Sequence, residues 1–562
     1  MYLQNVASLS MEQNPEDTQR QQMSKNNMEN RNLITSNSVQ IQTVSDWRIY
    51  MRVPATLGAG KIAFEPNRVG ELPEAVLASA FLLAKIGDPN GARERLNSLQ
   101  MMIGSGSSDV ASLAGDILLV DAHVKVYEDR ALTKEDSAQL AQLLSTLPAN
   151  DLVGQAMTFN HLSTAALHRG EFDRAQDHAE NAIRLYRLGD AQFGSLHMHT
   201  HLGQIRMMRG DLTGAIVQYD EMESSFEELT SDPQGLRAIC QALKSEVHFE
   251  MNEMGVAQSL LDEALKSIEQ TDAWLDILAA TYRVRARLAF VRAGLPGTLT
   301  ELAHADAAAR DRQMPRLAQL MAVERIRALT LSDEIKTANK EMNRIGIDPS
   351  KLDVGQPDKD WGLRHGTTNV AIARWLVRAR RPKRALAFVE LAEETAIKGG
   401  QLLSLAKLRV IRAQAFWQLK ARRDATGALL SAIRLLGNQP FRRFILDEGL
   451  PLRPAVQAVL DGEYVTVPIN TAQRRQLSEI MHYWSLGAEP SEVGCLLNQK
   501  SQSTKRYLEL LSKGHSNKEI GSVMGVSTNT VKYHLKQIYG DLRVKNRASA
   551  VNQARELGII DA

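Results

Sequence analysis

Apolar residues along most of this chain recur at intervals of three and four positions, the spacing of an amphipathic helix rather than of a strand. From about residue 72 to residue 460 such segments alternate with short breaks rich in glycine, aspartate, arginine and proline. The spacing is plain at Leu260, Leu261, Ala264, Leu265 and Ile268. Aromatic residues make up only 5% of the chain and β-branched runs are few, which favours helices over sandwiches or barrels. We therefore predict an all-α protein.

Several of the breaks share one pattern, in which a glycine or basic turn is followed by a small residue that enters a second helix. The pattern ends at Ala92, Ala175 and Ala215 and, in weaker copies, at Ala257, Gly297, Ala385 and Ala428. Neighbouring copies lie 40 to 43 residues apart, and two longer intervals of 83 and 88 residues are each about two periods. Helix pairs that repeat every 40 residues predict a TPR-like α-solenoid, in which the small residue lets helices approach closely. The alternative is an irregular helical array whose turns coincide by chance.

We divide the chain into a disordered N-terminal tail, a helical-repeat effector or sensor domain, a linker and a small C-terminal domain, over residues 1–45, 46–460, 461–495 and 496–562. The tail holds twenty Asn, Gln and Ser residues and little that could form a core. The spaced methionines Met11, Met23 and Met28 leave open that the native chain starts further downstream. The linker contains turn residues and one short predicted helix, TAQRRQLSEIMHYWSL.

Charge is unevenly distributed. The whole chain carries 67 Lys and Arg against 65 Asp and Glu, a net +2 that indicates no partner. The last 67 residues, however, carry eleven basic and five acidic side chains, so the rest is mildly acidic. Two cysteines, Cys240 and Cys495, exclude a disulfide framework and a cysteine-rich zinc site. With no apolar run of about 20 residues and no secretory signal at the start, we expect a cytoplasmic protein with no membrane partner.

The basic C-terminal domain contains the pattern of a helix-turn-helix. Gly514 ends one apolar-periodic helix, and the run from Ser516 to Glu519 is a capping box that opens a short second helix. After Gly525, Ser527 can cap a longer helix over residues 528–542. Two helices of about eight and fifteen residues joined by a tight turn that contains glycine are typical of DNA-binding helix-turn-helix motifs.

The longer helix has two distinct faces. The residues expected to face the core are Val531, Leu535, Ile538 and Leu542. Another face, without any acidic residue, consists of Asn529, Lys532, Tyr533 and Lys536, which we predict to read base edges in the major groove. The predicted contacts to the DNA backbone are Ser516, Asn517, Thr528, Thr530, His534, Lys545 and Arg547. His534 could instead pack beneath the helix, and the alternative for the four base-reading residues is an ordinary polar face exposed to solvent.

The stretch from residue 514 to residue 554 closely resembles the LuxR-type helix-turn-helix. Its hallmarks here are the run from Ser516 to Ile520, Thr530-Val531-Lys532 followed by His534, Ile538-Tyr539, and Asn546-Arg547 before Ala550-Val551. The resemblance implies a four-helix domain whose helix from Thr528 reads the major groove and whose last helix, from Asn546, pairs two protomers on DNA. One departure is the segment from Lys500 to Thr504, where the family usually has Leu-Thr-x-Arg-Glu. The first helix is therefore expected to be capped differently, by Ser501 or Ser503.

The segment from Phe441 to Gly449, which follows the helix pairs, resembles the end of the effector domain of large MalT-like LuxR regulators. Those regulators normally begin with a nucleotide-binding ATPase. The nearest string here, from Gly58 to Ile62 and including Lys61, lacks the first glycine and the Ser or Thr of a phosphate-binding loop. We expect no ATPase and no cofactor.

Two other clusters contain residues that could form binding sites. His197 and His201 would share a helix face and could hold a metal, but no further ligand completes the site, so we expect no metal centre. A basic patch around residues 374–384 could bind an anion or DNA, although a solvated turn is the simpler interpretation. No nucleophile elbow, zinc-hydrolase motif or dinucleotide-binding turn is present, so we predict that the chain is not an enzyme.

These observations predict a sequence-specific DNA-binding transcriptional regulator, an activator rather than a repressor. Its partners would be the major groove of double-stranded DNA and an effector ligand or protein sensed by the solenoid, with RNA polymerase a further candidate and a dimer expected on DNA. One alternative is a TPR-like protein-binding adaptor with a vestigial DNA-binding module. A degenerate nucleotide-driven switch is another.

Overall fold

The computed structural model describes residues 46–52, 72–104, 112–228, 234–268, 273–348, 365–485 and most of 501–556. The predicted tail over 1–45, the string around Lys61 and Cys495 lie outside this part of the chain. Every regular element among the described residues is an α-helix or a 3-10 helix. None of these helices is long and apolar enough to span a bilayer.

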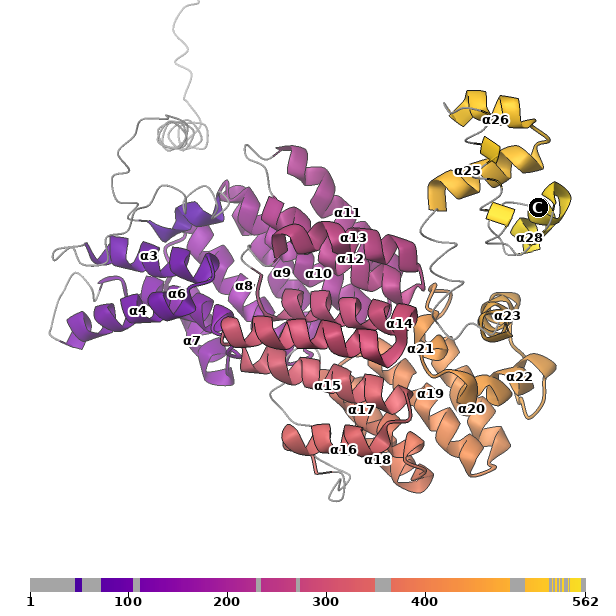
Figure 1. The fold of residues 1–562 in the computed structure, drawn as a ribbon. Helices are drawn as coiled ribbons and strands as arrows, with labels where there is room; N and C mark the ends of the chain where they lie inside the picture. Colours follow the sequence, from indigo (N-terminus) through magenta and orange to yellow (C-terminus); the bar gives the residue numbers. More distant parts are fainter. Residues whose placement is uncertain are drawn as a thin grey trace, which may run out of the picture.

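The helical-repeat domain begins with the short helix η1 (Trp47–Met51), whose Trp47 and Tyr50 are buried. The paired helices that follow are α3 (Pro73–Lys85) and α4 (Pro89–Gly104), α6 (Ala114–Tyr127) and α7 (Lys134–Thr146), α8 (Leu152–His168) and α9 (Phe172–Leu188), α10 (Gln192–Met208) and α11 (Leu212–Ser224), α12 (Gln234–Glu250) and α13 (Met254–Ile268), the two arms of α14 (Leu275–Asp311), α15 (Pro315–Leu331) and α16 (Ile335–Arg344), α17 (His365–Arg378) and α18 (Pro382–Lys398), and α19 (Leu402–Gln418) and α20 (Arg422–Leu435). Figure 1 shows them stacked in sequence order. The predicted all-α solenoid is confirmed.

Each turn inside a pair contains a residue with a positive φ. These residues are Gly87, Asp129, Gly170, Gly210, Asn252, Gly294, Asp333, Arg380 and Lys420. They lie 39 to 42 residues apart, except for one interval of 47. Such left-handed residues end a helix because the chain must turn sharply there, and Gly or Asn adopts this backbone most easily. The 40-residue period is thus a repeat of turn geometry.

The small residue that follows each turn is buried, as the sequence pattern predicts. Ala92, Ala175, Ala215, Ala257 and Ala385 have no exposed surface. In every case the alanine amide donates a hydrogen bond to the carbonyl four residues earlier, in the first turn of the second helix. A small side chain at this position therefore lies where the two helices of a pair meet.

At two copies the predicted small residue is not the buried one: Gly297 lies one position before it and Ala428 three positions after it. Thr298, not Gly297, fills the buried position after the kink at Gly294 in α14, and its hydroxyl donates to the carbonyl of Gly294 at 3.0 Å. In α20 the fully buried residue is Ala425, while Ala428 is only half-buried. A further copy, at the fully buried Ala338 of α16, escaped the sequence pattern because its turn contains no glycine.

The first helix of each pair is buried more completely than the second. In α10 only Gln192 and Arg206 are not buried, whereas α9 buries six of its seventeen residues. The reason is that the superhelix closes on itself, so that residues about 230 apart in the sequence touch. For example, the Gln439 amide donates to Asp211 at 3.1 Å and the Asn90 amide donates to Gln313 at 2.9 Å. The inner helices consequently have neighbours on every side.

Three further helices complete this domain: α21 (Arg443–Leu446), α22 (Arg453–Asp461) and α23 (Thr471–Ser485). The short helix predicted within the linker is α23, but it is not a free connector. Its Leu477, Ile480 and Trp484 belong to the same hydrophobic core as Phe441 and Phe444. Residues 471–485 therefore extend the helical-repeat domain beyond the boundary expected from the sequence.

Candidate nucleic-acid interface

The C-terminal helices enclose a core of their own. These helices are α25 (Ser501–Ser512), α26 (Asn517–Met524), the long helix that contains Val531, Leu535 and Ile538, and α28 (Arg547–Glu556). The buried residues of this core are Tyr507, Leu508, Leu510, Leu511, Ile520, Val531, Leu535, Ile538, Ala550 and Ala554. Three of the four positions predicted to face inward on the long helix are among them, and the fourth, Leu542, lies outside the described residues. The predicted four-helix arrangement is confirmed.

The turn between α25 and α26 has the predicted capping geometry. Gly514 has a φ of 84° and ends α25. The backbone N–H of Ser516 donates to the Glu519 carboxylate at 2.6 Å, and the N–H of Glu519 donates to the Ser516 hydroxyl oxygen at 3.4 Å. The hydrogen bonds from Ser516 lower the pKa of Glu519. This reciprocal capping box fixes the start of α26, the helix that precedes the predicted reading helix.

The described part of the long helix carries both a core face and an exposed face. Val531, Leu535 and Ile538 are at most 4% exposed, whereas Thr528 and Lys532 are exposed. Ser516 is also exposed and Asn517 is half-buried. Five other predicted DNA contacts on this helix, and one after it, lie outside the described residues: Asn529, Thr530, Tyr533, His534, Lys536 and Lys545.

The structure gives Arg547, predicted as a phosphate contact, an additional structural role. One terminal nitrogen of its guanidinium group donates to the carbonyl oxygen of Leu511 at 2.9 Å, at the C-terminal end of α25. Carbonyl groups there lack helical partners, so a nearby arginine satisfies them. The preceding Asn546 caps α28, since its side-chain oxygen accepts the N–H of Ser549 at 2.9 Å. The last helix starts where the sequence predicts.

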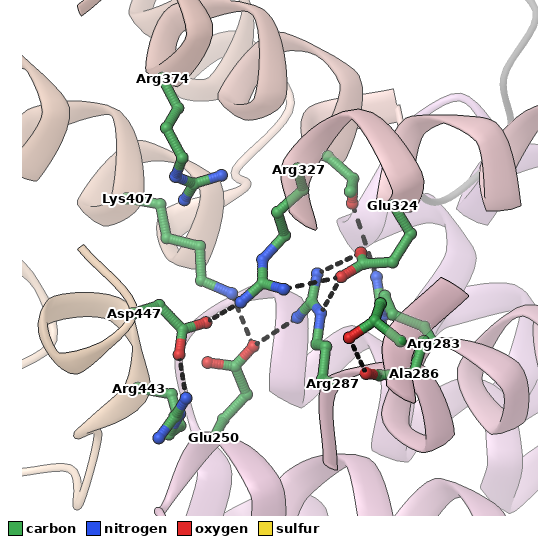
Figure 2. A network of polar contacts seen from close by, with 12 residues as sticks. Glu250, Arg283, Ala286, Arg287, Glu324, Arg327, Arg374, Lys407, Arg443 and Asp447 are labelled. Carbon is green, nitrogen blue, oxygen red and sulfur yellow. Dashed lines mark hydrogen bonds and ion pairs between the residues drawn. The ribbon is translucent and has the colours of Figure 1, made fainter. Parts of the chain in front are cut away.

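A second polar cluster, which sequence reasoning missed, lies inside the superhelix (Figure 2). Arg287 of α14 donates twice to Glu324 of α15, both at 2.9 Å. Arg327 joins this pair to the next, because it donates to Glu324 at 3.0 Å and to Asp447 at 2.5 Å. Burial alone would raise the pKa of Glu324, but the Arg287 and Arg327 guanidinium groups outweigh it and lower that pKa. Arg283 and Arg287, four residues apart and therefore on one face of a largely apolar helix arm, were the available sequence signal.

The cluster also joins helices that are distant in sequence. The Lys407 ammonium group of α19 donates to Glu250 of α12 at 2.6 Å, and Arg443 pairs with Asp447. Arg374 of α17 donates to Glu448 at 2.9 and 2.6 Å. Ion pairs thus tie the fifth helix pair to α19, and α17 to the segment that follows α21.

The basic patch around residues 374–384 therefore divides in two. Arg374 is 4% exposed and bound to Glu448, and Arg378 donates to the Glu448 carbonyl at 2.7 Å. The interpretation as a solvated turn is wrong for these two arginines, because both bind Glu448, which lies 70 and 74 residues further on. Arg380 and Lys383 are exposed, as a solvated turn predicts.

The histidines of α10 line a separate chamber near the N-terminal end of the superhelix. His197 and His201 share it with His123 and His161, and all four side chains are at most 8% exposed. The Ser163 hydroxyl lies 3.0 Å from Nδ1 of His201. Across the described residues no three His, Cys, Asp or Glu side chains form a group that could hold a metal ion.

Fold and site together define a class: a closed helical-repeat domain followed by a compact helix-turn-helix. Comparison with protein families agrees. Residues 115–460 match the MalT-like TPR region, and residues 501–554 match the bacterial regulatory proteins of the luxR family. The chain belongs to the MalT-like TPR family and carries a luxR-family domain at its C-terminal end.

Curated relatives share one or both parts. HTH-type transcriptional regulator AlkS of Alcanivorax borkumensis is 21% identical over 453 residues, which cover 79% of this chain and 49% of that protein. Putative HTH-type transcriptional regulator YhjB of Escherichia coli is 46% identical over 54 residues, 10% of this chain and 27% of its own length. HTH-type transcriptional regulator MalT of Serratia proteamaculans is 27% identical over 158 residues, 26% of this chain and 18% of its own. The chain thus spans about half the length, or less, of the relatives it matches. A solved Rap protein complexed with Competence and Sporulation Factor is 12% identical, at a TM-score of 0.48 over 65% of this chain and 99% of that one.

Proposed function

We propose that this protein is a DNA-binding transcriptional regulator, an activator without catalytic activity of its own, that acts in the cytoplasm. The observation that carries the proposal is the capped helix-turn-helix, whose long helix buries Val531, Leu535 and Ile538 and leaves Lys532 exposed. The names of the AlkS, YhjB and MalT relatives support the same function. The helical-repeat domain, in this account, senses an effector ligand or protein and controls the C-terminal reader.

The proposed DNA contacts of the helix-turn-helix fall into two groups, base contacts and phosphate contacts. Asn529, Lys532, Tyr533 and Lys536 would contact base edges in the major groove, where Lys and Asn can pair with guanine and adenine. The residues that would hold phosphates are Ser516, Asn517, Thr528, Thr530, His534, Lys545 and Arg547. Because α28 buries only Ala550 and Ala554 in the domain core, its opposite side remains available for a second protomer. We propose that the protein binds a two-fold symmetric site as a dimer and contacts RNA polymerase there.

Lys532→Ala is expected to weaken binding to the specific site by about 1–3 kcal/mol, because it removes a base contact. The site is first selected from random duplexes with the full-length wild-type protein. Dissociation constants are then measured by fluorescence anisotropy at several salt concentrations, since phosphate contacts alone depend on salt. Lys398→Ala, in the exposed part of α18, removes the same side chain from the helical-repeat domain and should leave binding unchanged.

Two outcomes would contradict this proposal. Wild-type affinity in Lys532→Ala at every salt concentration would show that the reading face is assigned wrongly. If the wild-type protein selects no sequence above its salt-dependent background, the DNA module is vestigial and the chain is a protein-binding adaptor.

A further inference from the structure

The charged cluster inside the superhelix surrounds a cavity. The space between its side chains, the open mouth toward solvent included, is about 620 Å³. Its polar wall comes from α12, α14, α15, α17, α19 and the segment after α21. The charged residues that line it are Arg283, Arg287, Arg327, Arg374, Lys407, Glu250 and Asp447. Helices from the middle and from the end of the repeat array therefore line the same cavity.

Positive charge is in excess around this cavity. Five cations line it against two carboxylates. Four further charged residues pair with the lining residues: Glu246, Glu324, Glu448 and Arg443. With these included, the cluster contains six cations and five anions. Most of these side chains are buried, and Lys407 and Asp447 are partly buried, so an uncompensated charge here is costly. Burial, with Arg287 nearby, lowers the pKa of Lys407 despite its pair with Glu250, as expected where cations outnumber anions.

Hydrogen-bonding capacity is also left over at the cavity wall. The Nε of Arg283, a residue 7% exposed, has no hydrogen-bond partner, although its terminal nitrogens reach Glu246 and, at 3.5 Å, the Thr367 hydroxyl. In Figure 2 the Arg374 guanidinium group and the Lys407 side chain extend from α17 and α19 into the same space. The rest of the wall includes apolar residues: Met207, Met208, Val370, Leu403 and Phe444.

A cation-rich wall with an unpartnered donor, next to an apolar wall, matches a ligand with an oxyanion at one end and hydrocarbon at the other. We propose that this cavity binds a small organic anion, with its carboxylate or phosphate group beside Arg283, Arg374 and Lys407. Its apolar part packs against Met208, Val370 and Phe444. That this anion is the sensed effector rests on the proposed function, whereas the binding site itself does not.

Binding is tested with the full-length protein by isothermal titration calorimetry at constant ionic strength. The probes are butyrate, monobutyl phosphate and 1-butanol, which share a chain and differ only in the head group. We expect saturable binding of one equivalent of butyrate or of monobutyl phosphate and none of 1-butanol. The anion with the lower dissociation constant shows whether the site prefers a carboxylate or a phosphate group. Equal binding of 1-butanol, or no binding of either anion at 10-millimolar probe, would overturn the site.

Paired variants locate the site. The double variant Glu250→Gln with Lys407→Met removes one cation and one anion, so the total charge of the cluster is unchanged, and is expected to weaken anion binding at least about tenfold. Its matched control, Glu394→Gln with Lys398→Met, removes the exposed pair of α18 and should bind like wild type. Unchanged affinity in the first double variant would contradict the assignment.

A second variant keeps the test decisive if the double variant does not fold. Thr367→Glu places a carboxylate at the cavity wall beside Arg283, so it should abolish anion binding and raise the melting temperature of the protein. Undiminished binding in Thr367→Glu overturns the site. These titrations contain no DNA. A negative result would therefore exclude the anion site without bearing on DNA binding, and a failure to bind DNA would not affect the measured anion affinity.

Discussion

Arg287→Met is expected to lower the free energy of unfolding by about 3–5 kcal/mol, the usual cost of removing one partner from a buried ion pair. Arg287 is 7% exposed and donates to both oxygens of Glu324 at 2.9 Å. Without it, the Glu324 carboxylate stays buried with Arg327 as its remaining cation. Urea unfolding of the full-length protein, followed by circular dichroism, measures the loss.

Two controls separate buried charge from lost contact. The double variant Arg287→Met with Glu324→Leu removes both charges and should recover much of the loss, because apolar groups of similar volume often replace a buried pair at little cost. Arg174→Met breaks an exposed pair with Glu171 and should cost about 1 kcal/mol at most. If Arg287→Met costs no more than Arg174→Met, the inner network does not stabilise the superhelix.

Acidification from pH 7.5 to pH 5.5 is expected to lower the free energy of unfolding by about 3 kcal/mol. Burial lowers the pKa of His161 to about 4 and of His201 to about 3, and holds the pKa of His123 well below its usual value. Between these values and the unfolded pKa of about 6.5 the unfolded chain binds more protons, so stability is complete above that range and falls as the pH drops. Each histidine costs about 1.4 kcal/mol at pH 5.5. Burial also raises the pKa of Asp129 to about 6, which opposes the loss by about 1 kcal/mol.

Urea unfolding at the two pH values and one ionic strength measures this effect. His161→Gln cannot titrate, so it should remove about a third of the histidine contribution. Equal stability at both pH values, or higher stability at pH 5.5, would contradict the burial of neutral histidines in the N-terminal chamber.

Local signals predicted most of the fold. The small residues at Ala175 and Ala215 and the glycine turns before them recur because each helix pair needs the same sharp turn and close approach. Where another residue meets that need, the pattern fails, as at Thr298 and at Ala338. Closure of the superhelix could not be predicted, because it depends on contacts such as Asp211 with Gln439 that span more than 200 residues.

The two sites also differ in whether local sequence or long-range contacts form them. The helix-turn-helix was predictable because its capping box at Ser516 and its core residue Val531 lie within one short segment. The anion cavity was not, since Arg374 finds Glu448 and Lys407 finds Glu250 only after distant helices meet. A sequence read segment by segment assigns such charges to solvent.

We propose that the C-terminal helix-turn-helix reads a specific DNA sequence. The most direct measurement is chromosomal occupancy of the full-length protein at its native level, compared with that of Lys532→Ala. We predict that the wild-type protein occupies discrete sites that share one two-fold symmetric motif and that Lys532→Ala loses them. Occupancy that shares no motif and is the same for both proteins would contradict sequence-specific binding by this helix-turn-helix.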